Sequence, residues 1–231
     1  MRDGIIRQRR VRLKRLRWTQ GWLLLVLLSL LAMMVLYSVM REHTALLGLG
    51  LAGVLLGSFR ALDRSRRDWG LAIALAVPHV VLIAIHDPAA DGPTLRVAGQ
   101  VLGILFYGFG AYAIFSHVVR ARVVVADTLY GAASVYLLLA LAWALAYAVL
   151  HTYQPLAFVS EGRVLVWDDF VYFSVVTLTT LGYGEITPVT PAARSLVMLE
   201  VVVGVFYTTV VLARLVGLYI AQATAGRARD D

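Results

Sequence analysis

The sequence predicts an all-α membrane protein with six transmembrane helices, and three observations support this. Apolar residues make up 60% of the 231 residues and charged residues only 15%, which is too apolar for a soluble domain of this length. Apolar stretches recur along the chain, most of them near the roughly 20 residues that a helix needs to cross a bilayer. Basic residues gather at the ends of these stretches, where they set membrane topology.

The charge and the cysteine count exclude several function classes. The net charge of +7 comes from residues that flank apolar runs, so we expect membrane lipid rather than nucleic acid as the partner. The chain has no cysteine, which excludes disulfides, thiolate metal sites and cysteine nucleophiles. Neither Gly-x-Ser-x-Gly nor His-Glu-x-x-His occurs. We therefore expect no enzyme activity and no cofactor.

The first half of the chain is predicted to be a basic tail and a four-helix membrane domain. Residues 1–20 carry eight basic residues against the single acid Asp3, so this end should stay cytoplasmic. The tail is a plain topology signal or, alternatively, an anchor for anionic lipids. Residues 21–122 form the membrane domain, with predicted spans at 21–40, 44–59, 69–85 and 96–119.

Pro78 and His79 lie near the middle of the third span. A proline there predicts a kink, and a histidine places a polar group in hydrocarbon. Because histidine titrates near neutrality, His79 could sense protons. The alternative is a neutral imidazole that is hydrogen-bonded inside the helix bundle.

Residues 123–222 read as a second unit, followed by a short cytoplasmic tail at 223–231. A span at 127–150 leads to a long outside stretch. A short helix is then predicted at about 168–179, with Asp168 and Asp169 as N-capping carboxylates. At about 18 Å this helix is too short to cross the membrane, so it should be re-entrant. Thr190-Pro191 is a typical start for the last span, which should run to about residue 221.

The stretch Thr177-Leu-Thr-Thr-Leu-Gly-Tyr-Gly-Glu185 joins the re-entrant helix to the last span. Glycine readily adopts the positive φ values that turn successive carbonyls to one side. The alternation of Gly182 and Gly184 with larger residues therefore predicts a strand that lines a pore with carbonyl oxygens, with the Thr180 hydroxyl below them. The alternative is a glycine-rich turn between two spans.

This nine-residue run resembles the filter signature of the tetrameric potassium channel superfamily, Thr-Val/Ile-Gly-Tyr-Gly-Asp. Leu181 and Glu185 depart from that signature. The resemblance implies carbonyl oxygens that replace the hydration shell of K⁺, and a homotetramer, because one chain supplies one filter strand and coordination needs a ring of four. The filter residues would be Thr180, Leu181, Gly182, Tyr183 and Gly184, with K⁺ held transiently at the first four.

Other residues are expected to support this filter. Thr177, Thr179, Tyr172, Phe173 and Glu185 would brace it and form its outer mouth. In the last span, Gly204 matches the position of the family's inner-helix hinge, although a packing glycine is the alternative, and Thr208 would line the cavity. Glu200 either hydrogen-bonds the back of the re-entrant helix or reaches the outer interface. We expect Arg214 to extend toward the cytoplasmic headgroups.

In voltage-gated relatives, the four helices before the pore form a sensor whose fourth helix carries an arginine at every third position. Here the fourth span has arginine only at its outer end, Arg96. We therefore expect weak or absent voltage gating and a packing role for these helices.

The resemblance implies a passive K⁺ channel in a cell membrane. We expect this to be a bacterial inner membrane, with both termini of the chain in the cytoplasm. The expected topology places 16 of the 21 basic residues on the cytoplasmic side. The alternatives are a non-selective cation channel on the same scaffold and a non-conducting scaffold or partner subunit. The gating stimulus and any regulatory subunit are left open.

Overall fold

The computed structural model describes residues 65–85, 92–160 and 162–230, and ten single positions between 25 and 56. The basic tail at 1–20 and most of the predicted spans at 21–40 and 44–59 lie outside the described residues. The elements are α3 (Arg66–Ile85), α4 (Pro93–Arg120), α5 (Ala126–Tyr153), β1 (Phe158–Ser160), α6 (Trp167–Leu178), β2 (Ile186–Pro188) and α7 (Pro191–Asp230).

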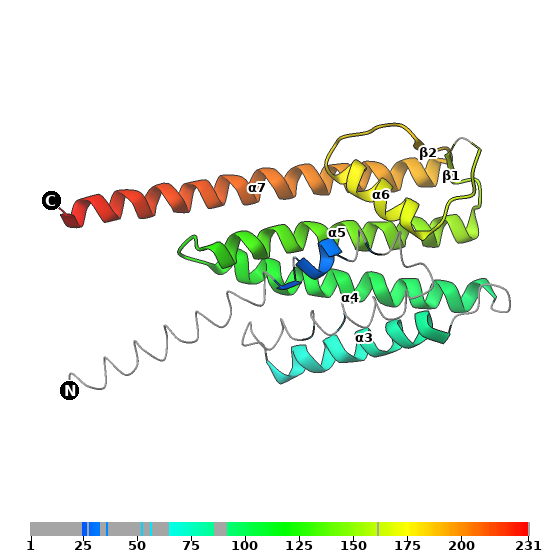
Figure 1. Ribbon diagram of the computed structural model, residues 1–231, viewed down its shortest axis with the longest axis horizontal. Helices are drawn as coiled ribbons and strands as arrows, with labels where there is room; N and C mark the ends of the chain where they lie inside the picture. The colour runs from blue at the N-terminus through cyan, green and yellow to red at the C-terminus, as the bar shows by residue number, and fades with distance from the viewer. Residues whose placement is uncertain are drawn as a thin grey trace.

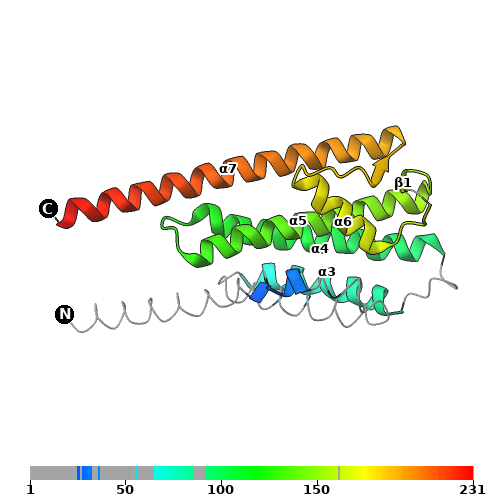
Figure 2. The same cartoon turned by 45° about the horizontal axis from the view of Figure 1, so that its top comes forward.

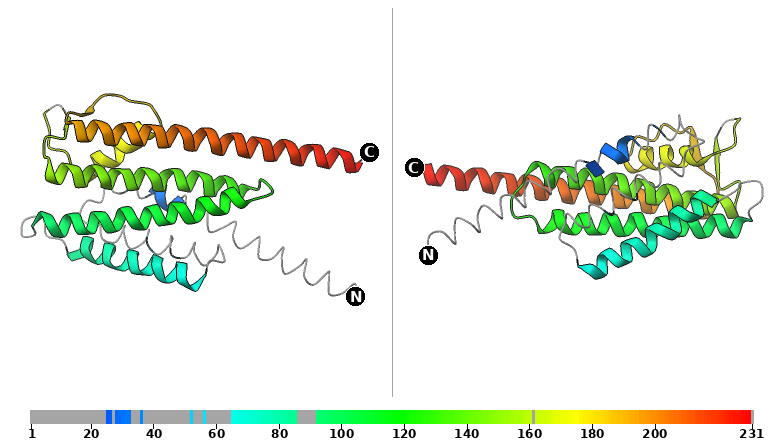
Figure 3. Two further views of the ribbon diagram at one scale, coloured as in Figure 1. Left: turned by 180° about the vertical axis from the view of Figure 1, so that it is seen from behind. Right: turned by 60° about the horizontal axis from the view of Figure 1, so that its bottom comes forward.

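The long helices lie side by side along one direction, in the order α3, α4, α5 and α7 (Figure 1). Helix α4 packs on both α3 and α5. The short helix α6 lies at one end of the bundle, where it contacts both α5 and α7 (Figure 2). The carboxyl-terminal end of α7 extends past α3, α4 and α5 (Figure 3).

Three of these helices are long and apolar enough to cross a membrane: α4, α5 and α7 up to Thr224. The described residues are mostly helical, with three helices able to cross a membrane, which agrees with the prediction of an all-α membrane protein. The count of six spans stays a prediction. Helix α7 begins at Pro191, as predicted, and the Ala193 amide donates to Thr190 Oγ1 over 3.3 Å. It is longer than predicted, because residues 222–230 continue the helix.

His79 joins α3 to α4 inside the bundle. Its side chain is buried, and Nδ1 lies 2.8 Å from the carbonyl oxygen of Gly99. A carbonyl can only accept, so Nδ1 carries the hydrogen. The ring also packs edge-on against Tyr107 at 5.6 Å between centroids. Of the two interpretations of His79, the hydrogen-bonded imidazole is the one that these contacts match.

The buried side chains form two main clusters. The larger lies between α3, α4, α5 and α7, with residues such as Phe106, Ile114 and Leu141. The smaller lies beside α6, where Phe158 of β1 packs edge-on against Tyr147 of α5 and Phe173 of α6 at 5.1 and 5.6 Å. This second cluster fixes α6, and with it the loop that follows.

Candidate functional site: an ion-filter loop

Helix α6 has only 12 residues, Trp167–Leu178, about 18 Å at 1.5 Å per residue, so it cannot cross a bilayer. Its start is capped as predicted, by Asp169. One carboxylate oxygen of Asp169 accepts the amide of Val166 at 2.8 Å, and the other pairs with Arg163 at 2.5 Å. A carboxylate in the first helical turn stabilises free amides and interacts favourably with the helix dipole.

The other end of α6 is closed by the loop that follows it. The carbonyls of its last turn accept hydrogen bonds from the amides of residues 179 to 181, at 2.9 to 3.0 Å. The carbonyl of Leu178 instead accepts from the hydroxyl of Tyr136 on α5, at 2.7 Å. The loop therefore starts directly on the carboxyl end of α6, where the helix dipole places its partial negative charge.

The backbone of this loop alternates in conformation. Thr180, Gly182 and Gly184 have φ values of 60°, 59° and 85°, whereas Leu181 and Tyr183 do not have positive φ. Such alternation is what a strand of pore-facing carbonyls requires. The left-handed Thr180 was not expected, since this conformation costs a residue with a Cβ about 1–2 kcal/mol. The side chains of Leu181 and Tyr183 are 55% and 65% exposed in the single chain.

The outer end of the loop is held by two contacts. The Tyr172 hydroxyl donates to a carboxylate oxygen of Glu185 over 3.1 Å. Strand β2 then pairs antiparallel with β1, with Val159 opposite Thr187. This pair was not expected from the sequence, because three-residue strands are too short to show a period of two.

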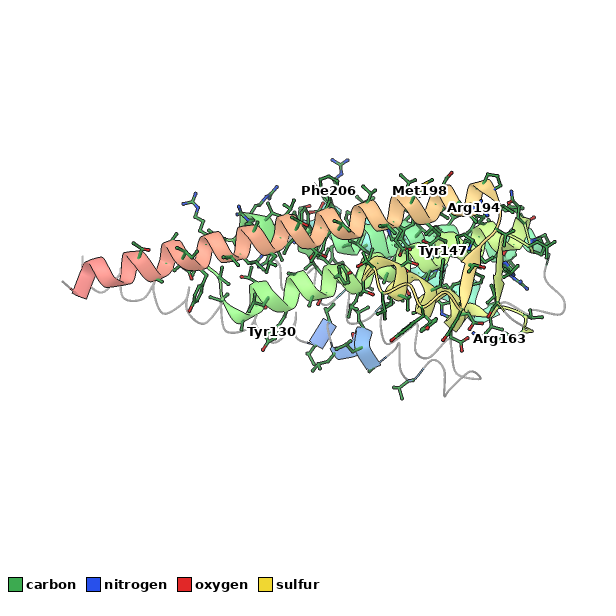
Figure 4. The ribbon with its side chains drawn as sticks, turned by 90° about the horizontal axis from the view of Figure 1, so that it is seen from above. Tyr130, Tyr147, Arg163, Arg194, Met198 and Phe206 are labelled. Carbon is green, nitrogen blue, oxygen red and sulfur yellow. The ribbon has the colours of Figure 1, made fainter. Side chains whose placement is uncertain are left out.

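Behind α6, Glu200 of α7 is completely buried. One oxygen lies 2.5 Å from Ser174 Oγ of α6, and the other accepts a hydrogen bond from the Tyr147 hydroxyl of α5. Figure 4 shows Tyr147 close to α7. Of the two interpretations of Glu200, these contacts match the one in which it bonds the back of the re-entrant helix. Ser174 and Tyr147 carried no motif in the sequence and were missed.

The remaining predicted residues of the site lie on α6, at its carboxyl end and on α7. Phe173 packs on Tyr147 and Phe158, so its ring joins α6 to α5 and β1. Thr177 is buried in the last turn of α6, and the Thr179 hydroxyl bonds the Val175 carbonyl at 2.7 Å. The exposed Thr208 donates to the Gly204 carbonyl of its own helix at 2.9 Å.

Arg214 makes a different contact from the one expected. Its guanidinium donates to the carbonyls of Val119 and Ala121, the latter at 3.2 Å. These carbonyls lie at the carboxyl end of α4, where helix carbonyls lack intrahelical partners. Arg214 therefore joins α7 to the α4–α5 connection instead of extending toward headgroups.

Most of α7 is uncovered. In the most apolar stretch of α7, only 17% is buried, whereas the corresponding share is 44% in α4 and 50% in α5. Large apolar side chains of α7, such as Met198 and Phe206, are 61% and 67% exposed (Figure 4). A partner protein or lipid must cover this face.

Comparison with known proteins relates part of the chain to ion channels. Residues 133–221 match the ion channel family. The chain is 32% identical over 93 residues to potassium channel K1 of Plasmodium berghei (strain Anka), covering 38% of this chain and 5% of that protein. It is also 44% identical over 48 residues to two pore potassium channel c of Oryza sativa subsp. japonica. That match covers 21% of this chain and 10% of the relative.

The chain thus spans at most a tenth of the length of these relatives. No solved structure matches it. The family match includes α6, the loop with alternating φ values and the apolar part of α7. Through this segment, the chain is similar to the ion channel family and to two potassium channels.

Proposed function

We propose that this chain is the subunit of a homotetrameric channel that conducts K⁺ selectively and passively across a membrane. The observation that carries the proposal is the loop with positive φ at Thr180, Gly182 and Gly184, which begins on the carboxyl end of the short helix α6. Irregular backbone at membrane depth is tolerated where protein surrounds it or where it lines a water-filled cavity. Such a cavity is the conduction path of a channel.

In this proposal, carbonyl oxygens of residues 180 to 184 and the Thr180 hydroxyl replace the water around K⁺. Uncharged oxygens can perform this exchange, because each ion meets several of them at once. The carboxyl end of α6 adds partial negative charge below the filter. The hydrogen bond from Tyr172 to Glu185 holds the outer mouth.

Tetramer formation would bring four filter strands around one axis. Two features of the single chain support it: the filter side chains are exposed, and the apolar face of α7 is largely uncovered. Neighbouring subunits would cover part of this face, the pore would wet another part near Thr208, and lipid would cover the rest.

Residues 123–222 form the pore domain, and residues 21–122 form a collar that does not confer strong voltage gating. The tails at 1–20 and 223–231 face the cytoplasm of a bacterial cell. K⁺ and lipid are then the expected partners, and transport rather than catalysis is the expected activity.

The decisive experiment is the reversal potential of the purified protein in planar bilayers, with K⁺ on one side and Na⁺ on the other. A selective filter predicts a reversal near the K⁺ equilibrium potential. A reversal near zero would mean that Leu181 or Glu185 has relaxed selectivity and would favour the non-selective channel. The absence of current under all conditions would favour the non-conducting scaffold.

A further inference from the structure

Three elements of the pore domain meet at the buried carboxyl group of Glu200. Ser174 of α6 and Tyr147 of α5 each contact one of its oxygens. Ser174 Oγ also lies 2.8 Å from the carbonyl oxygen of Ala140 on α5. The group therefore has three short oxygen–oxygen contacts, and the hydrogens available for them can be counted.

Two oxygens that lie within hydrogen-bond distance need one hydrogen between them, so each of these three contacts needs one. Tyr147 supplies the hydrogen toward Glu200 Oε2. Ser174 has a single hydrogen but two neighbouring oxygens, those of Glu200 and Ala140. The Ala140 carbonyl can only accept, so it takes the Ser174 hydrogen. The hydrogen between Ser174 and Glu200 must then come from Glu200.

The surroundings of Glu200 agree with this count. Its side chain is completely buried, and it forms no ion pair with any residue of the described part of the chain. The titratable groups near it are the phenols of Tyr147 and Tyr136, both on α5. An ionised carboxylate buried without a cation is strongly unfavourable. A neutral acid satisfies all three contacts without that cost.

We infer that Glu200 is a neutral, protonated positioning residue, whose own hydrogen joins α7 to Ser174 of the re-entrant helix while Tyr147 joins it to α5. Its role follows from where Ser174 lies. This serine is six residues before Thr180, and the filter loop is bonded to the last turn of the same helix. The network therefore fixes the helix from which the filter starts, and it does so without placing a charge behind the ions. The link to selectivity rests on the proposed channel function; the protonation state does not.

The protonation state is tested by infrared difference spectroscopy of the full chain in lipid vesicles at neutral pH. Subtracting the Glu200→Gln spectrum from the wild-type spectrum should reveal the carbonyl stretch of a protonated carboxylic acid. Glu185→Gln is the matched control, because Glu185 is exposed, and it should leave this band in place. A Glu200→Gln difference that contains only carboxylate bands would overturn the inference.

The partners are tested by the same measurement. Removing a hydrogen-bond partner changes the frequency of a carboxylic acid, so Ser174→Ala and Tyr147→Phe should each shift the band. Both variants remove one hydroxyl and keep the rest of the side chain. A band that neither substitution moves would contradict the network.

The positioning role is tested by the reversal potential. Glutamine can donate its amide hydrogen to Ser174 and accept from Tyr147, so Glu200→Gln should keep the wild-type value between K⁺ and Na⁺ solutions. Glu200→Ala removes both links and should shift the reversal toward zero. If Glu200→Gln shifts it as far as Glu200→Ala, the charge is needed and the inference is wrong. If even the wild type passes no current, the channel proposal fails, and the infrared result still decides the protonation state.

Discussion

Gly204 of α7 lies directly against Leu178, the last residue of the re-entrant helix α6. A Cβ at position 204 would come within 2.8 Å of the Leu178 carbonyl oxygen and 2.9 Å of its Cδ1. The same carbonyl accepts the hydrogen bond from Tyr136 of α5. Three helices therefore meet at one backbone group, directly before the loop with alternating φ values. This contact supports the packing interpretation of Gly204 over the hinge.

Gly204→Ala should therefore displace α6 from α7, because the group that it meets is backbone. Overpacking of this kind costs about 1–3 kcal/mol, and we expect a lower thermal unfolding temperature of the protein. Gly217→Ala is the control. That position of α7 has open space around it in the single chain, and alanine favours a helix by about 1 kcal/mol over glycine. If the Gly204→Ala protein has unchanged stability but its channel opens with a different probability, the hinge interpretation of Gly204 would be favoured instead.

Gly182→Ala should abolish selective K⁺ conduction. Gly182 has a φ of 59°, and an alanine there would cost about 1–2 kcal/mol or force the carbonyls out of line. Gly162→Ala provides the matched control, since Gly162 has a φ of 73°, no neighbour within 4 Å, and a position before α6. It should lose similar stability but keep the reversal potential. Equal loss of selectivity in both variants would mean that the effect is general destabilisation.

Arg214→Gln should loosen the α4–α5 connection. The substitution removes the charged donor that Val119 and Ala121 share, and a single hydrogen bond contributes about 1 kcal/mol to stability. We expect faster amide hydrogen exchange in residues 118–125, measured by mass spectrometry. Arg122→Gln changes an exposed arginine of the same connection and should leave the exchange unchanged. Identical exchange in the Arg214→Gln protein would show that this contact does not hold the connection.

Phe158→Ala should weaken the outer end of the filter. Phe158 is buried between Tyr147, Phe170 and Phe173, and its strand β1 pairs with β2 just after Glu185. Truncation of a buried phenylalanine costs about 3–5 kcal/mol. We expect reduced thermal stability and a reversal potential shifted toward zero. Val159→Ala, at a side chain that is 40% exposed, should have little effect on either quantity.

Arg96→Gln should leave the voltage dependence of the current nearly unchanged. Arg96 is exposed in the first turn of α4, at the end of a helix that carries no further arginine until Arg120. A single charge near the interface moves through little of the membrane field. Current recorded over a range of voltages tests this, and a steep shift of the opening curve would contradict the packing role of the first four helices.

The sequence by itself predicted the class and the location of the pore segment. Long apolar runs must become helices in lipid, because every backbone group needs an internal partner. The start of α7 at Thr190-Pro191 and the capping of α6 by Asp169 are local effects, which residues within one helical turn decide. For the same reason, Gly182 and Gly184 could be assigned positive φ values before any fold was known.

Only the tertiary structure decided which residues meet. Tyr147 and Ser174 are 53 and 26 residues from Glu200 in the chain, and nothing in their local sequence marks them as its partners. The contact of Arg214 with the end of α4 and the pairing of β1 with β2 have the same origin. These contacts depend on how helices of similar apolar character pack against one another, and hydropathy alone does not distinguish one apolar face from another.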